Sequence, residues 1–510
     1  METVQEYCKS QNIEFTPMNA FMRACIDGNL DMVQFILSLS SNDIPFGNEE
    51  NDEPFKIEEN EELVEKSDIN SCINSAFQYA CKSGSLELVK FLLEYAKENN
   101  MEIDINAYDD YAFQLACESG NLELVKFLIE YAKMNNLEID INADNGCAFQ
   151  CACESGNLEL VKFLLEHAEM NNMKININVE DYAFRLACGS GNLDVVKFLL
   201  EYAEMNNMEI DINVQRDCVF RLACGDGSLE LVKFLLEYAE MNNTEIDINA
   251  DDEYAFRLAC RSGNLELVKF LLSLSNDASF EVEENDSSFK NAEENNMEIN
   301  TNADGDHAFQ CACVSGNLEL VKFLLEYAKM NNMEININAD DEYVFRLACG
   351  SGNLELVKFL LEYAKINNTE ININVDDNYA FRIACGSDNL ELVKFLLFSI
   401  NEFLNDISFG NELVEIDIHA GNDHAFRRCE NEEIMNFLLL LLNQNGDEFY
   451  FRKENQYYIV KPLDFEMDLS RTKFEYFQIY HEETDYIDDC IEAYKLHLQR
   501  FRKKSTLSAN

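Results

Sequence analysis

Apolar and polar positions follow the same order again and again along this chain. Residues 254–272 read YAFRLACRSGNLELVKFLL, and almost the same phrase stands at 111–129 and at 343–361. Phe, Ala and Cys recur in it at i, i+3 and i+4, which places them on one face of a short helix. Leu, Val and Leu then form the apolar stripe of a second helix, whose Lys and Glu face water. Each phrase therefore predicts a pair of amphipathic helices.

The residues between the two helices predict a tight turn. Gly263 can adopt the left-handed backbone conformation that such a turn requires. Asn264 follows where a helix N-cap is expected, and Glu266 lies in the first helical turn, near the positive end of the helix dipole. The pair Asn242-Asn243 predicts the end of a second helix, because Asn is the residue after Gly that best tolerates a left-handed cap.

The phrase recurs at a nearly constant period. Its central Phe is found eleven times, mostly 36 residues apart and once 35 apart, and three intervals are longer, at 56, 53 and 45 residues. A fixed period between about 20 and 50 residues is typical of stacked repeat proteins. The eleventh copy is shortened and has lost its glycine, as expected of a terminal repeat with one face in water. The markers are Phe21, Phe77, Phe113, Phe149, Phe184, Phe220, Phe256, Phe309, Phe345, Phe381 and Phe426.

These residues carry a resemblance to the ankyrin-repeat family. The phrase AFRLACRSGNLELVKFLL matches the family pattern TPLHxAAxxGHxxVVxLLL in its two small residues, its turn glycine and its paired leucines. Asp247-Ile248-Asn249 matches the loop signature of the family. The resemblance covers residues 19–442 and implies an all-α fold, an ankyrin-type α-solenoid of stacked helix–turn–helix repeats with loop or hairpin connections.

The chain departs from the family pattern in the loop before each first helix. The Pro of the pattern is replaced by Ala or Val, and the Thr is replaced by Tyr, Cys or His. In the family, the Thr and His side chains brace this loop, so its shape is left open here. Gln or Arg replaces the His, at Gln114, Arg185, Arg257 and Arg346 among others.

The three longer intervals indicate insertions near 38–70, 273–300 and 398–420, each of which follows a second helix. They are rich in Asn, Asp, Glu and Ser, so we expect surface loops that divide the stack into blocks. Residues 1–18 form a lead-in. Residues 443–510 are dense in Tyr and Phe and lack the phrase, and their segment TDYIDDCIEAYKLHLQRFRKK predicts an amphipathic helix that covers the end of the solenoid.

Cysteine occupies one repeat position in all eleven copies. It replaces the second small alanine of the family pattern and acts there as a small buried apolar residue. Neighbouring thiols should lie about 8–10 Å apart, too far for a disulfide, and many unpaired thiols favour a reducing compartment. The phrase Cys-Ala-Cys at 151–153 and 311–313 suggests a metal site, but positions i and i+2 of a helix face different ways and no His cluster accompanies them. We therefore expect no metal and no cofactor. The repeated cysteines are Cys25, Cys81, Cys117, Cys153, Cys188, Cys224, Cys260, Cys313, Cys349, Cys385 and Cys429.

The formal net charge of −57 limits the kinds of partner that the chain can attract. A polyanion is repelled by nucleic acid and by anionic lipid, so we expect a protein partner that is basic. The alternative is that the acidic residues only keep a long surface soluble. No apolar run approaches the roughly 20 residues that cross a bilayer, and the N-terminus shows no secretory signal. We expect no membrane insertion and a cytoplasmic or nuclear location.

The resemblance implies a non-catalytic function, protein–protein interaction through a concave face of loop tips and first helices. No phosphate-binding loop, HExxH or Gly-x-Ser-x-Gly motif occurs in the sequence, so we expect no enzyme. Two other functions stay open. One is a substrate adaptor of a ubiquitin-ligase assembly with the C-terminal tail as recruiter, and the other is a tether for a cytoskeletal or membrane protein.

Comparison of the copies locates candidate contact residues. The residue type at the position after each repeated Cys differs from copy to copy, while the neighbouring positions hardly vary. Such variation indicates either selection for contacts with a partner or an exposed position without constraint. The loop tips are acidic, and the separation of adjacent tips is close to the Debye length, about 8 Å. Their electric fields therefore add and attract a basic partner. The alternative is that the acidic tips only keep this edge of the stack solvated. The first set is Lys82, Glu118, Glu154, Arg261 and Val314. The second set is Asp109, Asp110, Asp251, Asp252, Glu253, Asp340, Asp341, Glu342, Asp376 and Asp377.

Overall fold

The computed structural model describes most of the repeat region and three strands of the tail. It covers Tyr7, residues 17–39, 66–274 and 303–406, about half of 414–438, and the strands at 449–453, 456–462 and 474–478. Most of 174–181 and the single loop positions 209, 213, 245, 334, 338 and 370 lie outside it. The chain divides into two units, Met1–Ala255 and Phe256–Asn510, with the boundary inside helix α14 (Ala250–Ser262).

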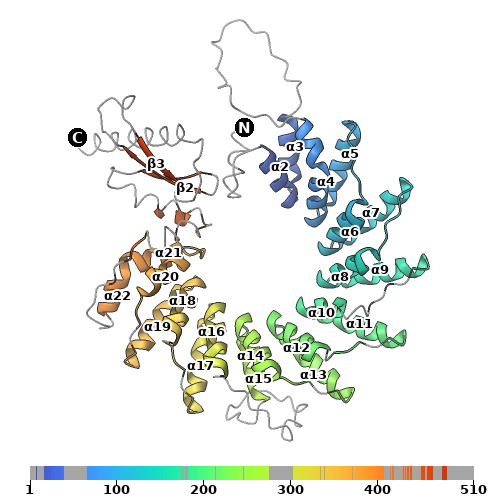
Figure 1. Cartoon of the computed structure of the whole chain (residues 1–510). Coiled ribbons are helices and arrows are strands. Elements are labelled where there is room, and N and C mark those ends of the chain that lie inside the picture. Colours follow the sequence, from blue (N-terminus) through green and yellow to red (C-terminus); the bar gives the residue numbers. More distant parts are fainter. Residues whose placement is uncertain are drawn as a thin grey trace. The chain divides into compact units, whose positions relative to one another are not determined.

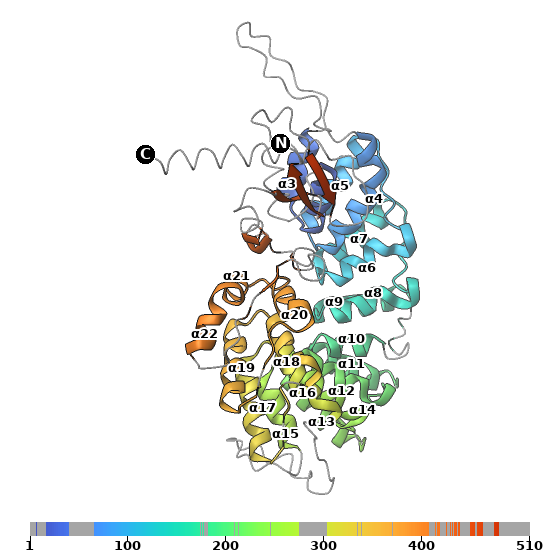
Figure 2. The same ribbon diagram turned by 60° about the vertical axis from the view of Figure 1, so that its left-hand side comes forward.

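Unit 1 consists of helix pairs in which the first helices form one layer and the second helices another (Figures 1 and 2). Each pair joins one first helix to the second helix that follows it across the glycine turn. The pairs are α2 (Pro17–Ile26) with α3 (Leu30–Leu39), α4 (Lys66–Lys82) with α5 (Leu86–Glu98), α6 (Ala107–Glu118) with α7 (Leu122–Met134), α8 (Ala143–Glu154) with α9 (Leu158–Met170), α10 (Tyr182–Gly189) with α11 (Leu193–Met205), and α12 (Val214–Asp226) with α13 (Leu229–Met241).

Unit 2 repeats the same plan, so the prediction of an all-α, ankyrin-type solenoid is confirmed for the repeat array. Its last second helix contains a π-helical segment, η2 (Phe395–Ser399), between two α-helical segments. The helices are α14 with α15 (Leu265–Ser273), α16 (Ala303–Ser315) with α17 (Leu318–Met330), α18 (Ala339–Gly350) with α19 (Leu354–Ile366), and α20 (Val375–Ala384) with α21 (Leu390–Lys394), η2 and α22 (Ile400–Asp406).

The tail adds a small antiparallel sheet that the sequence analysis did not predict. Its order is β1 (Phe449–Lys453), β2 (Gln456–Pro462), β3 (Phe474–Gln478), with Phe451 opposite Tyr458 and Val460 opposite Tyr476. The aromatic density of this region, which the sequence shows plainly, is typical of strands. The amphipathic helix predicted for 484–504 lies outside the described residues.

The core of each repeat is the predicted apolar face. The repeated Phe is buried in ten copies, for example Phe113 and Phe256, and the side chain of the eleventh, Phe426, lies outside the described residues. All eleven repeated cysteines are buried free thiols, as the sequence predicts. Burial raises the pKa of thiols such as Cys81 and Cys224 above the usual range. Cysteine therefore serves as a small packing residue here.

The turn and cap predictions are also confirmed. Gly263 has φ +75°, and the Asn264 side chain accepts hydrogen bonds from the backbone N–H groups of Glu266 and Leu267 at 3.0 and 3.1 Å. At the end of α13, Asn243 has φ 51°, and the N–H of Thr244 donates to the Ala239 carbonyl at 2.9 Å. This 6→1 hydrogen bond is the signature of the Schellman motif.

The insertions do not interrupt the stacking of repeats. The Asn317 amide donates to the Gly263 carbonyl at 2.8 Å, and Lys269 Nζ lies 5.8 Å from the Phe323 ring centroid, although residues 275–302 separate these partners. Across the first insertion, the Cys72 thiol lies 3.5 Å from Met18 Sδ. The expected division of the stack into blocks is therefore wrong at these two insertions.

Candidate functional site

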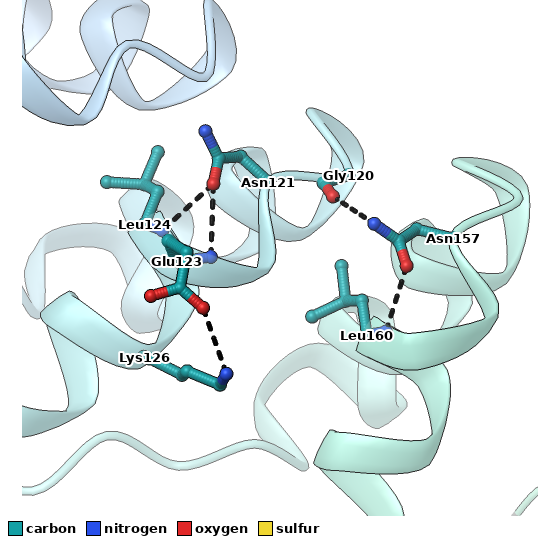
Figure 3. Close-up of polar contacts among 7 residues, drawn as sticks. All are labelled: Gly120, Asn121, Glu123, Leu124, Lys126, Asn157 and Leu160. Atoms are coloured by element: carbon teal, nitrogen blue, oxygen red, sulfur yellow. Dashed lines mark hydrogen bonds and ion pairs between the residues drawn. The ribbon is translucent and has the colours of Figure 1, made fainter.

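In six of the described repeats, one asparagine side chain links the repeat to the repeat before it, as Figure 3 shows for Asn157. Asn157 Oδ1 accepts from the Leu160 N–H at 3.1 Å and so caps α9, while its Nδ2 donates to the Gly120 carbonyl of the preceding turn at 2.7 Å. Asn121 makes the same contact to Gly84 at 2.8 Å. Since every link fixes the end of one helix pair against the next, the side chains of successive first helices are held in register.

The loop tips at the start of α6, α8 and α20 are short left-handed turns. Tyr108, Asp109 and Asp110 have φ values of 57°, 56° and 60°, and Asp376, Asp377 and Asn378 have values of 53°, 54° and 58°. L-residues rarely adopt this conformation, and Asn and Asp tolerate it best among the residues other than Gly. The acidic composition of the tips therefore has a backbone cause besides any effect on charge.

The Gln or Arg that replaces the family's His braces this turn. Gln114 Nε2 donates to the Asp109 carbonyl at 2.8 Å, and Arg382 donates to the Asp376 carbonyl at 2.6 Å. Both acceptors lie at the tip, five or six residues before the donor. This contact settles the loop shape that the sequence left open.

Asp110 is not available to a partner, so its prediction as a contact residue is wrong. Its side chain is 6% exposed and accepts hydrogen bonds from the Asn106 amide and from the backbone N–H of Asp140, the latter at 2.9 Å. Asp140 belongs to the loop of the next repeat. Burial raises the pKa of Asp110 from its ordinary value. The left-handed turn directs this carboxylate into the stack rather than into water.

Two other tip carboxylates pair with arginines of the preceding first helix. Arg221 forms an ion pair with Asp251, and Arg346 forms one with Asp376. The side chains of Asp251 and Asp376 remain 36% and 56% exposed.

The other tip residues are less uniform. Asp109 and Asp377 are exposed, and Glu253 is half-buried. The side chains of Asp252, Asp340, Asp341 and Glu342 lie outside the described residues.

The position after each repeated cysteine lies on the surface, as expected. Lys82 and Glu118, on successive first helices, form an ion pair at 3.0 Å and stay 54% and 38% exposed. Glu154 and Arg261 are exposed, and Val314 is 38% exposed. Lys82, Glu118 and Glu154 lie on successive first helices of unit 1, and Arg261 and Val314 have the same repeat position in unit 2.

The structure adds a row of tyrosines that the sequence analysis recorded only as a departure from the family pattern. The tyrosine row consists of Tyr111, Tyr182 and Tyr254 in unit 1. Tyr343 has the same repeat position in unit 2, and the four residues are 39–44% exposed. The residue lies two positions before the buried Phe, so the repeated letters YAF and YVF were the signal.

Arginine side chains of the same layer lie against these rings. Arg185 stacks on Tyr182 at 5.0 Å from the ring centroid, and Arg346 lies 5.4 Å from Tyr343 and 5.3 Å from Tyr379. Such cation–π contacts, which Arg221 also makes with Tyr254, hold Tyr182, Tyr254 and Tyr343 in place while leaving part of each residue open to solvent.

The fold and the layer of ordered first-helix side chains define a helical repeat protein. A family model described as ankyrin repeats (3 copies) matches segments that together span residues 2–370, more than half of the chain. The chain therefore belongs to the ankyrin-repeat family, whose members generally mediate protein–protein interactions. The matched segments are 2–138, 113–215, 184–286, 220–339 and 281–370.

Among solved structures, 105 chains match. One is the crystal structure of the human ASB11 ankyrin repeat domain, with 21% sequence identity and a TM-score of 0.28. The match covers 46% of this chain and 95% of that one. No curated protein matches the sequence.

Within the part of the chain that the structure describes, no group of three or more His, Cys, Asp or Glu side chains is placed to hold a metal ion. Over the same residues, no helix has the length and apolar character that a membrane span requires.

Proposed function

We propose that this chain is a non-catalytic scaffold that binds a partner protein across its first-helix layer. The observation that carries the proposal is the tyrosine row. Tyr and Arg are among the residues that most often dominate the energy of protein interfaces, and a Tyr ring buries a large area at a small entropic cost. A partly exposed ring every second repeat in unit 1 supplies several such anchors.

The layer is also organised before any partner binds. Asparagine links and arginine–tyrosine contacts fix the anchors, so binding orders few side chains and loses little entropy. The variable residues Lys82, Glu118 and Glu154 lie in the first-helix layer of unit 1 and would set specificity there, and Arg261 and Val314 would do so in unit 2. The exposed carboxylates of Asp109 and Asp377 would speed the approach of a basic partner, chiefly through the association rate.

The test compares two sets of tyrosine substitutions in the full chain. Tyr111→Ala, Tyr182→Ala and Tyr254→Ala together remove three anchors of the row. Tyr131→Ala, Tyr202→Ala and Tyr238→Ala together remove equally many half-buried rings from the second helices. Quantitative affinity capture should show that proteins enriched by the unsubstituted chain fall by about tenfold or more with the first set only.

Thermal unfolding of both triple variants controls for loss of fold. Retention of the same partners by the first set, or equal loss with both sets, would contradict the proposal. An increase in captured basic proteins at low salt, lost at high salt, is the expected sign of the acidic tips.

The alternative of a ubiquitin-ligase adaptor depends on the tail at 443–510, whose predicted helix lies outside the described residues. No observation favours it or the tether over the simple scaffold. Capture with and without 443–510 separates them, because an adaptor would lose ligase components only in the shortened chain. The cytoplasmic or nuclear location and the avoidance of nucleic acid remain part of the proposal.

A further inference from the structure

The second-helix layer carries its own row of exposed apolar side chains. The last residue of α9, α11 and α13 is Met170, Met205 and Met241, and these side chains are 73%, 71% and 71% exposed. We call these three residues the methionine edge. They lie on consecutive repeats of unit 1 and belong to the layer opposite the tyrosine row.

The cap motif does not account for these methionines. Its apolar residue is the one three positions later, for instance Met208, whose N–H donates to the Ala203 carbonyl at 2.9 Å and whose side chain is half-buried. The last helical residue makes no such contact and faces water. Lys or Glu would serve equally well there as helix formers, as at other exposed positions of the same helices. Folding therefore gives no reason for methionine at this position.

The charged residues one and four positions before each methionine of the edge, on its own helix, are all negative. Exposed glutamates precede each Met by four residues and by one residue, and in α9, α11 and α13 no Lys stands at these positions. In α7 and α17, by contrast, Lys133 and Lys329 precede the corresponding Met. The glutamates are Glu166, Glu169, Glu201, Glu204, Glu237 and Glu240.

The second helices that carry the methionine edge contact one another along their length. Tyr202 of α11 donates to Glu169 Oε1 of α9 at 3.2 Å. Lys162 Nζ lies 5.8 Å from the Phe198 ring, and Lys197 Nζ lies 5.1 Å from the Phe234 ring. The three methionines therefore form one row, spaced by about one helix packing distance of 8–10 Å.

We propose that the methionine edge docks a basic amphipathic helical segment of a partner protein. Unbranched thioether side chains adapt to apolar partners of varied shape, and the flanking glutamates complement Lys and Arg at the rim. A second copy of this chain, with its net charge of −57, and an anionic lipid surface are both disfavoured by repulsion. The surface is separate from the tyrosine row and does not depend on the function proposed for it.

The probe is a synthetic helical peptide of roughly 18 residues, long enough at 1.5 Å per residue to span the three methionines. It carries Leu on one face and Lys on the other, and it binds the full chain in a fluorescence anisotropy titration. Two comparison peptides replace Lys by Glu, or Leu by Ala. We expect both to bind at least about tenfold more weakly, since both contact types are needed.

Two triple variants test the location of the peptide. Met170→Gln, Met205→Gln and Met241→Gln keep helix propensity and charge and should weaken the Leu/Lys peptide about tenfold. The matched control changes Met134, Met330 and Ile366 to Gln; these exposed residues have the same repeat position but are preceded by Lys. The control should change affinity by less than about twofold, which corresponds to about 0.4 kcal/mol.

Methyl NMR of methionine-labelled chain gives an independent readout. The methyl signals of Met170, Met205 and Met241 should shift on addition of the Leu/Lys peptide, while that of Met330 should not. Absence of binding to the unsubstituted chain, equal binding of the Glu peptide, or equal effects of the two triple variants would each overturn the inference. The triple variant Tyr111→Ala, Tyr182→Ala and Tyr254→Ala should bind the Leu/Lys peptide with unchanged affinity. A failure of the proposed scaffold function is therefore distinguishable from a failure of the docking inference.

Discussion

Each repeated cysteine holds its thiol in the same apolar layer as the repeated Phe and Ala. Burial raises the pKa of Cys224 and Cys349 in the folded chain well above that of an exposed thiol, about 8.5. Below that pH both the folded and the unfolded chain keep the proton, and the free energy of unfolding is unaffected. Above it only the unfolded chain releases the proton, so stability falls as pH rises. Burial raises the pKa of ten of the repeated thiols in this way, which makes the protein sensitive to alkali.

Replacement of Cys224 by Ala should separate two contributions of this thiol to the free energy of unfolding, its packing in the core and its titration. At pH 7 we expect a loss of about 1 kcal/mol in the free energy of unfolding, typical of a small core deletion. Between pH 9 and pH 10, one thiol should account for about 1.2 kcal/mol of the pH dependence, and the variant should lack that share. Denaturant titrations at the three pH values measure both effects. An identical pH slope in the two proteins would argue against the linkage.

Helix pairs are joined at their ends by the asparagine links and along their sides by lysine. In the second helices, Lys90 and Lys126 lie 5.7 Å from the Phe127 and Phe163 rings of the next repeat, and Lys126 also pairs with Glu123 at 2.9 Å. The sequence analysis left these lysines in water. Each repeat therefore contacts its neighbour through a few recurring polar groups as well as through its apolar core, as expected of a stack with nearest-neighbour coupling.

Two substitutions at Asn157 should distinguish its capping role from its linking role. Asn157→Ala removes both the cap of α9 and the hydrogen bond to Gly120, and we expect about 1–2 kcal/mol of lost stability. Asn157→Asp keeps an acceptor at the helix N-terminus but removes the donor, so its loss should be about half as large. Hydrogen exchange in α8 and α9 localises the effect. An Asp variant as damaging as the Ala variant would assign the whole effect to the link.

At the scale of the whole molecule, charge is the dominant constraint. A net charge of −57 opposes compaction, and ion pairs such as Arg221–Asp251 and Lys82–Glu118 compensate only locally. Raising the salt concentration from about 0.01 to about 0.15 M shortens the Debye length from about 30 to about 8 Å, which screens repulsion between repeats more than it weakens contacts at 3 Å.

We therefore expect the unfolding temperature to rise with sodium chloride over this range, by several degrees in a scanning calorimeter. Sucrose at equal osmolality serves as the control, because it does not screen charge. A falling unfolding temperature would mean that the ion pairs, rather than the repulsion, dominate.

Much of the fold could be predicted because its causes lie close together in the sequence. Periodicity at i, i+3 and i+4 identified the buried Phe and Cys positions, and Gly263, Asn264 and Asn243 identified the turn and the caps. The candidate site was predicted less well. Of the residues chosen, Asp110 is buried and Asp251 and Asp376 pair within the stack, whereas the exposed tyrosines and methionines were not selected at all.

The sequence by itself determined the repeat, its two helices, its turn glycine and the role of its cysteine, since each follows from neighbours within a few residues. Only the tertiary structure decided which polar side chains face a partner. The left-handed tip directs Asp110 into the next loop, and stacking brings Arg346 onto Asp376, contacts between residues about 30 positions apart. Such contacts depend on how one repeat lies on the next, and a pattern within a single repeat does not contain that geometry.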